Sequence, residues 1–369
     1  MTRHVDQNWK LLQQTTFTKW VNNALRGHLK TARTQVSDLQ KDLRDGLVLV
    51  ELLESIASPR KVGRHNREPV IKPQMLENIG AVLRFLEREQ IKVVNIGPED
   101  IYSGNLKLIM GLIWTLIRHF QIRSSGKDLS TKNALLAWIN TQIPDQKVTN
   151  FTTDWNDGIA LCALVDRIRP GLCPHYATLR RSEALDNCQL GMDIAEEELG
   201  IPKLLEASDL RHSDVDELSV MTYVSYFCKP ANEQLLRWIQ NKIPQRTITN
   251  FKKDWNNGVN LACLVNNLVP GVFADCEELD PHDSLQNLTR AMKLAEERLC
   301  VKPVVKPSQL ADPKVDELNV ATYLSRFQYA KFLAYQPKEV SCTGHGLRKA
   351  FIGRPTFFQV DSSTAGVVC

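Results

Sequence analysis

The chain repeats itself at a fixed offset along most of its 369 residues. The segment LLAWINTQIPDQKVTNFTTDWNDGIALCALVDRIRPGL returns as LLRWIQNKIPQRTITNFKKDWNNGVNLACLVNNLVPGV, so that Trp138 corresponds to Trp238 and Gly158 to Gly258. The segment VDELSVMTYVSYF at 215–227 likewise returns as VDELNVATYLSRF at 315–327. A period of about 100 residues is the size of a whole domain rather than of a solenoid unit. The chain is therefore built from tandem domains of one kind.

A third, more divergent copy lies upstream of these two. Its segment DLRDGLVLVELLESI takes the place of DWNDGIALCALVDRI, and Gly46 takes the place of Gly158. After each glycine, apolar residues recur at i, i+3, i+4 and i+7, which is one face of an α-helix. The residues that follow this spacing are Leu49, Leu52, Leu53 and Ile56; Leu161, Leu164, Val165 and Ile168; and Leu261, Leu264, Val265 and Leu268.

The residue before the glycine is acidic in two of the three copies, which invites comparison with a catalytic carboxylate. The three copies carry Asp45, Asp157 and Asn257 at this place. A general acid or base would not usually tolerate asparagine, whereas either side chain can accept the unpaired N–H groups of a first helical turn. We therefore expect a structural role, with Trp155 and Trp255 as large core residues.

Before residue 340, few segments alternate apolar and polar residues with the period of two that is typical of strands, so the fold class is expected to be all-α. Each copy is expected to have about four main helices: an opening helix, the helix after the glycine, a middle helix and a closing helix. The polar segment 123–129 and the short segment 228–231 mark the expected boundaries. The expected domains are 13–122, 130–228 and 232–334, and the expected opening helices lie around 14–26, 131–142 and 232–242.

Net positive charge is concentrated in the N-terminal third of the chain. The whole chain has a formal net charge of +4, but residues 1–122 hold 18 Lys and Arg against 12 Asp and Glu. Such a bias favours an acidic partner, whether nucleic acid, phosphoinositide headgroups or an acidic protein surface. Without a recognised nucleic-acid motif, we expect no nucleic-acid partner.

The nine cysteines are scattered without a CxxC pair, which indicates reduced thiols and a cytoplasmic protein. The most apolar run, 108–117, is about half of the ~20 residues that cross a bilayer, so we expect no transmembrane segment. No phosphate loop, GxSxG or HExxH motif is present, and His65 has no second ligand at metal spacing. We expect no enzyme activity, no metal and no cofactor.

In combination, several segments of the first two copies resemble the tandem calponin-homology (CH) domains of actin-binding proteins, filamins above all. The resemblance implies compact helical domains and binding of actin filaments by the first two copies together. The first copy resembles the first CH type, and the other two resemble the second type. The segments of the first two copies on which this resemblance rests include QQTTFTKWVN, DLRDGLVLVELLE, NLKLIMGLIWTLIRHF, LLAWINTQIP, NFTTDWNDG and VDELSVMTY.

The tail at 340–366, VSCTGHGLRKAFIGRPTFFQVDSSTAG, is similar to the start of a filamin immunoglobulin-like repeat. A complete sandwich of that type needs about seven strands and ~100 residues. We therefore expect residues 340–369 to be an incomplete, poorly ordered repeat start, from a short isoform or a fragment.

The resemblance also implies where actin would bind. On the opening helix of the first copy, Phe17, Trp20 and Val21 form the inward face, which leaves the polar residues outward. A basic loop at 58–68 would steer encounter with the acidic surface of actin. The candidate actin-binding residues are Gln14, Thr15, Thr18, Lys19 and Asn22; Arg60, Lys61 and Arg64 of the basic loop; Lys107, Leu108, Leu112 and Trp114 of the closing helix; and Lys132 in the second copy.

The closing helix at 105–120 is apolar nearly all round and must be mostly buried. We hypothesise that a stripe around Leu108, Leu112 and Trp114 meets the second domain in a closed pair and actin in an open pair, with a few kcal/mol between the two forms. The basic loop suggests phosphoinositide binding as a secondary activity, because each charge near an anionic membrane adds about 1 kcal/mol.

The leading interpretation is a filamin-like, actin-filament-binding protein of the cytoplasmic actin cytoskeleton at the cell cortex. The third copy would serve cross-linking or scaffolding. The alternatives are a CH-domain signalling or microtubule-associated adaptor, a nucleic-acid binder and an enzyme. The sequence leaves the oligomeric state open.

Overall fold

The computed structural model describes residues 2–26, 35–122, 128–330, 341–343 and 359–361. It divides into two compact units. Unit 1 comprises Met1–Asn241, Thr247–Asp254 and Pro313–Ser325, and unit 2 comprises Lys242–Arg246, Trp255–Asp312 and Arg326–Cys369. Helices make up nearly all the regular structure of the described residues, which confirms the predicted all-α class.

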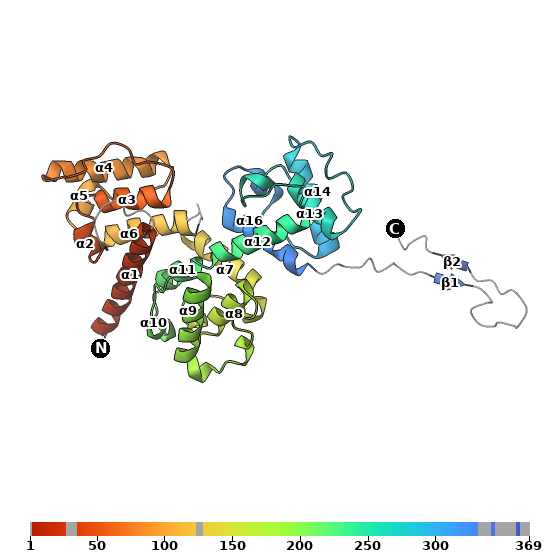
Figure 1. Cartoon of the computed structure of the whole chain (residues 1–369), viewed down its shortest axis with the longest axis horizontal. Helices are drawn as coiled ribbons and strands as arrows, with labels where there is room; N and C mark the ends of the chain where they lie inside the picture. Colours follow the sequence, from red (N-terminus) through yellow and green to blue (C-terminus); the bar gives the residue numbers. More distant parts are fainter. Residues whose placement is uncertain (1, 27–34, 123–127, 331–340, 344–358, 362–369) are drawn as a thin grey trace, which may run out of the picture. The chain divides into compact units, whose positions relative to one another are not determined.

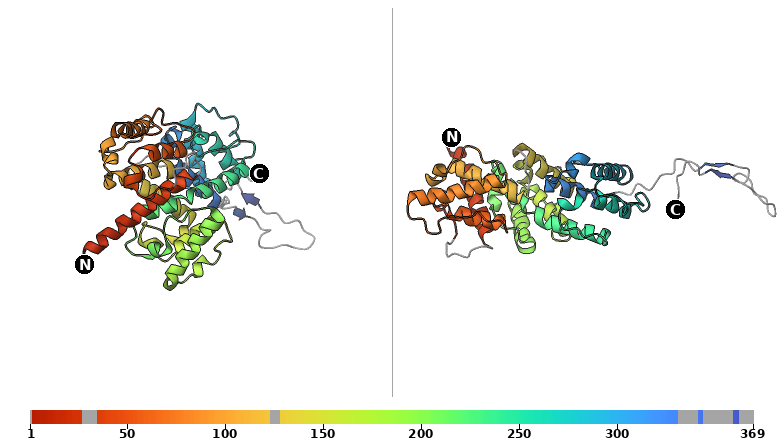
Figure 2. Two further views of the ribbon diagram at one scale, coloured as in Figure 1. Left: turned by 60° about the vertical axis from the view of Figure 1, so that its left-hand side comes forward. Right: turned by 90° about the horizontal axis from the view of Figure 1, so that it is seen from above.

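The first copy, in unit 1, begins with a long helix. Helix α1 starts at Thr2, well before the predicted residue 14. The early start was not predicted because the first half of the helix is largely polar and has no apolar periodicity. Figures 1 and 2 show this half extending beyond the other helices of the copy. The helices are α1 (Thr2–Leu25), α2 (Leu39–Asp42), α3 (Leu47–Ile56), α4 (Lys72–Arg88), α5 (Pro98–Tyr102) and α6 (Leu106–Leu116), which continues as a π-helical turn, Ile117–Gln121.

The second copy has the same order of main helices. It contains α7 (Asp128–Gln142), α8 (Ile159–Ile168), α9 (Ala184–Leu199), α10 (Ala207–Arg211) and α11 (Glu217–Ser225), with short 3-10 turns at Pro144–Gln146, Thr153–Trp155, Tyr176–Thr178 and Arg181–Glu183. Most of the expected boundary at 123–129 lies outside the described residues. The expected boundary at 228–231 is the first turn of α12 (Cys228–Lys242), where Cys228 and Ala231 are buried.

The third copy contributes helices to both units. Helix α16 (Glu317–Ser325) belongs to unit 1, where it packs against α7 and places Leu318 in the same core as the first two copies. Unit 2 holds α13 (Val259–Leu268), α14 (Ser284–Leu299), α15 (Pro307–Ala311) and the turn Arg326–Tyr329. Figure 1 shows α13 beside α14, and the two helices are in contact.

Two short strands occur in the tail. β1 (Ser341–Thr343) pairs antiparallel with β2 (Gln359–Asp361), and Ser341 lies opposite Asp361. Residues 344–358 and 362–369 lie outside the described residues, so the predicted repeat start stays a prediction.

Buried aromatic residues fill the core of unit 1. Trp20, Trp138 and Trp155 are each at most 1% exposed. Phe17 stacks on Trp114 with ring centroids 6.3 Å apart, and Phe151 stacks on Trp155 at the same distance. Trp155 is thus a core residue, as predicted, and so is Trp255 of unit 2, which is 0% exposed.

The three glycines that precede the second main helix have the same geometry. Gly46, Gly158 and Gly258 have φ of 78°, 74° and 79°, a region that suits glycine. A Cβ on Gly158 would lie 2.5 Å from the backbone nitrogen of Cys188, so the glycine also permits close approach of the middle helix. In each copy an asparagine of the middle helix donates to the carbonyl oxygen of the residue before the glycine. The three bonds are Asn78 to Asp45 at 3.1 Å, Asn187 to Asp157 at 2.9 Å and Asn287 to Asn257 at 3.1 Å.

Candidate functional site

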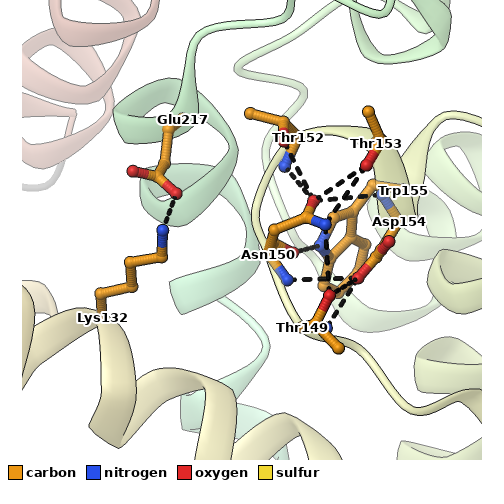
Figure 3. A network of polar contacts seen from close by, with 8 residues as sticks. All are labelled: Lys132, Thr149, Asn150, Thr152, Thr153, Asp154, Trp155 and Glu217. Carbon is orange, nitrogen blue, oxygen red and sulfur yellow. Dashed lines mark hydrogen bonds and ion pairs between the residues drawn. The ribbon is translucent and has the colours of Figure 1, made fainter.

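The DWNDG segment is held by a network of structural hydrogen bonds (Figure 3). The Asp154 carboxylate accepts from the backbone and hydroxyl of Thr149, both at 2.7 Å, and from the backbone of Asn150 at 3.2 Å. Burial raises the pKa of Asp154, but these hydrogen bonds outweigh it, so the pKa lies below its ordinary value. The Trp155 indole donates to the Asn150 carbonyl at 3.0 Å. A carboxylate used in this way organises the loop.

The residue before each of these glycines caps the helix that follows. The backbone N–H groups of Leu47, Ile159 and Val259 donate to the side-chain oxygens of Asp45, Asp157 and Asn257 at 2.9, 3.0 and 3.1 Å. The bond is kept where asparagine replaces aspartate, which confirms the predicted structural role.

The candidate residues of α1 differ in how free they are. Thr15 is exposed, while Gln14, Thr18 and Lys19 are half-buried. The Thr18 hydroxyl donates to the Gln14 carbonyl at 2.7 Å. Asn22 exchanges two bonds with the backbone of Val36, at 2.8 and 2.7 Å, so its amide holds the loop before α2. Thr15 is therefore the α1 candidate most open to a partner.

Helix α1 also contacts the second copy. Lys19 Nζ lies 2.8 Å from Glu206 Oε1, and Asn23 donates to the Tyr226 hydroxyl at 3.1 Å. Burial raises the pKa of Tyr226 to about 12, although the bond from Asn23 acts the other way. Sequence reasoning missed Glu206 and Tyr226, because contacts between copies leave no mark on the periodicity of either.

A groove of about 200 Å³ lies between α1 and the second copy. Its walls come from α1 on one side and from the segment 208–215 on the other. The lining residues are Trp9, Leu11, Leu12, Thr15, Ser208, Asp209, His212, Asp214 and Val215. The groove therefore borders the outward face that α1 offers at Thr15.

Two of the three basic-loop candidates are paired with acidic residues of the same copy. Arg60 forms an ion pair with Glu89, and Lys61 lies 2.8 Å from Glu54. Arg64 and the neighbouring Arg67 are exposed. The positive charge presented by this loop is therefore centred on Arg64 and Arg67, and the predicted phosphoinositide binding stays a prediction.

The candidates on α6 lie mostly inside the protein. Lys107 is exposed and Leu108 half-buried, but Leu112 is 2% and Trp114 7% exposed. The π-stacking of Trp114 on Phe17 fixes it in the core of the first copy. Of the predicted apolar stripe, this conformation offers only Leu108 to a partner. On α7, Lys132 forms an ion pair with Glu217 of α11 (Figure 3).

The helical copies match one known family. A family model for the calponin homology (CH) domain matches residues 11–122, 129–232 and 229–331. The chain belongs to the CH-domain family. Its three CH domains account for the repeated order of helices and for the repeated glycine and asparagine contacts. Among the described residues, no helix combines the length and the apolar character that a membrane span requires.

Curated relatives resemble parts of this chain. Filamin-C of Rattus norvegicus is 42% identical over 233 residues, which cover 61% of this chain and 8% of that protein. Alpha-actinin of Dermatophagoides farinae is 31% identical over 350 residues, covering 91% and 38%. The chain thus spans less than half the length of these relatives. The solved actin-crosslinking core of Schizosaccharomyces pombe fimbrin matches with a TM-score of 0.47 and 20% identity, over 86% of this chain and 74% of that one.

Proposed function

We propose that the chain is an actin-filament-binding protein of the cytoskeleton, and that binding resides in the first two CH domains, 13–122 and 130–228. The single observation that carries the proposal is the polar face of α1. This face exposes Thr15 and carries Lys19, which is paired with Glu206, at the border between two CH domains that are joined in one unit. The likeness to filamin-C and alpha-actinin supports the same function.

The geometry suggests how binding is controlled. The ion pair of Lys19 with Glu206 occupies a side chain that we expect to contact actin, and it joins the first CH domain to the second. Opening the pair would free Lys19, and a filament that binds only the open form would shift the population towards it. The contribution of one exposed ion pair is at most about 1 kcal/mol, so the closed form is held weakly by this contact.

The third CH domain is proposed to serve cross-linking or scaffolding. Removing residues 231–334 would also remove Ala231 and Leu318 from the core of unit 1, so a deletion would confuse loss of a binding site with loss of stability. Low-speed sedimentation of filaments with the full chain is the cleaner test, since bundles sediment and single filaments do not.

High-speed cosedimentation of the full chain tests the main proposal. The protein is mixed at tens of micromolar with actin filaments, with microtubules, or with DNA-cellulose. We expect it to pellet with actin filaments only. Pelleting with microtubules alone would favour the microtubule-associated alternative, and no pelleting with actin would refute the proposal.

A further inference from the structure

Three side chains with metal-binding atoms converge in unit 2. Cys263 lies on α13, and Cys276 and Glu277 lie on the loop that leads to α14. The two sulfur atoms and a carboxylate oxygen all lie within 4.8 Å of one another, and Cys263 Sγ is 3.6 Å from Glu277 Oε1. The thiols are 2% and 5% exposed, while the Glu277 side chain is 50% exposed. The cluster thus has a buried sulfur side and an open carboxylate side.

The Glu277 carboxylate is held in place from its other side. Arg246 Nη1 lies 3.2 Å from Glu277 Oε2, and Arg246 Nε donates to Asn260 Oδ1 at 2.8 Å. Gln245 donates to Oε1 at 3.3 Å. These contacts fix the orientation of the Glu277 carboxylate. Partners of this kind orient metal ligands from outside the coordination shell.

The second CH domain shows that the fold does not require this cluster. At the places of Cys263, Cys276 and Glu277 it carries Ala163, Tyr176 and Ala177, on α8 and between α8 and α9, which correspond to α13 and α14. Gln146 and Ala160 stand where the third domain has Arg246 and Asn260. The two thiols, the carboxylate and the residues that orient it are therefore all specific to the third domain.

We propose that Cys263, Cys276 and Glu277 bind a thiophilic divalent metal ion of the zinc class. Thiolate sulfur and carboxylate oxygen bind zinc at about 2.3 and 2.0–2.2 Å, which at tetrahedral angles places the ligand atoms about 3.5–3.8 Å apart. Cys263 Sγ and Glu277 Oε1, 3.6 Å apart, already have this spacing. Binding replaces two thiol protons by the metal and releases both to solvent. Three protein ligands leave the fourth tetrahedral position to water on the exposed side, as the open face next to Glu277 allows.

The first test is absorption spectroscopy with Co²⁺, a coloured substitute for zinc, added to the reduced full-length chain. We expect sulfur-to-cobalt charge-transfer absorption that saturates at one ion per chain and disappears when Zn²⁺ is added. Because two protons are released, affinity is expected to fall by up to about 100-fold for each pH unit below neutrality. Titration calorimetry in two buffers of different ionisation enthalpy measures the proton release directly.

Variants assign the site. Cys263→Ala introduces the residue that the second domain carries and is expected to abolish the absorption; Glu277→Gln, which leaves the core untouched, is expected to weaken binding by at least about 10-fold. Two controls are expected to leave the absorption unchanged. Cys300→Ser removes an exposed thiol of the same domain. Cys173→Ala removes one of the two neighbouring buried thiols of the second domain, Cys162 and Cys173.

The inference fails if the reduced wild-type chain gives no charge-transfer absorption. It also fails if the absorption survives Cys263→Ala, if Glu277→Gln leaves the affinity for cobalt unchanged, or if Cys173→Ala removes the absorption, since each of these results would place the metal elsewhere. Circular dichroism of each variant shows whether the fold is retained.

Discussion

Replacing Gly158 by alanine tests whether the DWNDG segment is architecture. The glycine has φ of 74°, and an added Cβ would lie 2.5 Å from Cys188 N, 2.6 Å from the carbonyl carbon of Asn187 and 2.7 Å from Asn187 Cβ. Two of these three atoms are backbone atoms of α9, which cannot rotate away. The substitution therefore forces α8 and α9 apart where Asn187 bridges them.

The magnitude follows from two separate costs. A non-glycine residue in the left-handed region costs about 1–2 kcal/mol. Forcing additional atoms into a packed site costs typically about 1–3 kcal/mol more. Gly158→Ala is thus expected to destabilise unit 1 by about 2–5 kcal/mol. Gly200→Ala is the matched control, because Gly200 has φ of 65° but nothing within 4 Å of an added Cβ, so only the first cost applies.

Urea unfolding followed by tryptophan fluorescence measures both variants, with Trp155 as a buried reporter beside the site. The midpoint of the unit 1 transition should fall clearly further for Gly158→Ala than for Gly200→Ala. Equal shifts for the two variants would refute the reasoning, because they would show that the close approach of α9 costs nothing.

Three further predictions concern binding and pH. Glu206→Ala releases Lys19, and we expect it to strengthen actin cosedimentation by at most about 5-fold, the equivalent of about 1 kcal/mol; weaker binding would contradict the proposed role of the Lys19–Glu206 ion pair. Raising KCl from about 50 to 200 mM is expected to weaken cosedimentation, because salt screens exposed charges such as Arg64 and Arg67; binding that is insensitive to salt would argue against steering by the basic loop. Burial and the nearby charge of Arg60 lower the pKa of His119 below its ordinary value of 6.5. Below pH 6.5 the unfolded chain binds a proton at His119 that the folded chain does not, so the free energy of unfolding is expected to fall as the pH falls. His119→Gln should reduce this pH dependence. If the free energy of unfolding from urea titrations between pH 5 and 7 varies equally in the variant and the wild type, the reasoning is wrong.

Much of the fold could be predicted because it is local and repeated. The apolar spacing after Gly46, Gly158 and Gly258 marks one helix in each copy, and the change from Asp157 to Asn257 shows that this position needs an oxygen acceptor rather than an acid. The first half of α1 could not be predicted, since it lacks an apolar stripe. The start of α12 at Cys228 was not predicted, because Pro230 indicates a domain boundary when the sequence is considered alone. Pro230 instead lies in the first turn of α12, where proline is tolerated.

The candidate site was harder to predict, because it depends on contacts between distant segments. The sequence places Asn22 on the outward face of α1, but its amide is bonded to the backbone of Val36. Trp114 lies on an apolar helix, and only the packing shows that it stacks on Phe17. Cys263 and Cys276 are separated by a helix end and a loop, so no ligand spacing links them in the sequence.

Actin cosedimentation of the full chain with four charges removed tests the central claim most directly. The variant combines Lys19→Ala, Arg60→Ala, Lys61→Ala and Arg64→Ala, and Lys293→Ala, an exposed residue of the third CH domain, is the control. We expect the fourfold variant to bind filaments at least about 10-fold more weakly, with an unchanged circular dichroism spectrum, while the control binds like the wild type. Undiminished binding by a folded fourfold variant would contradict the account.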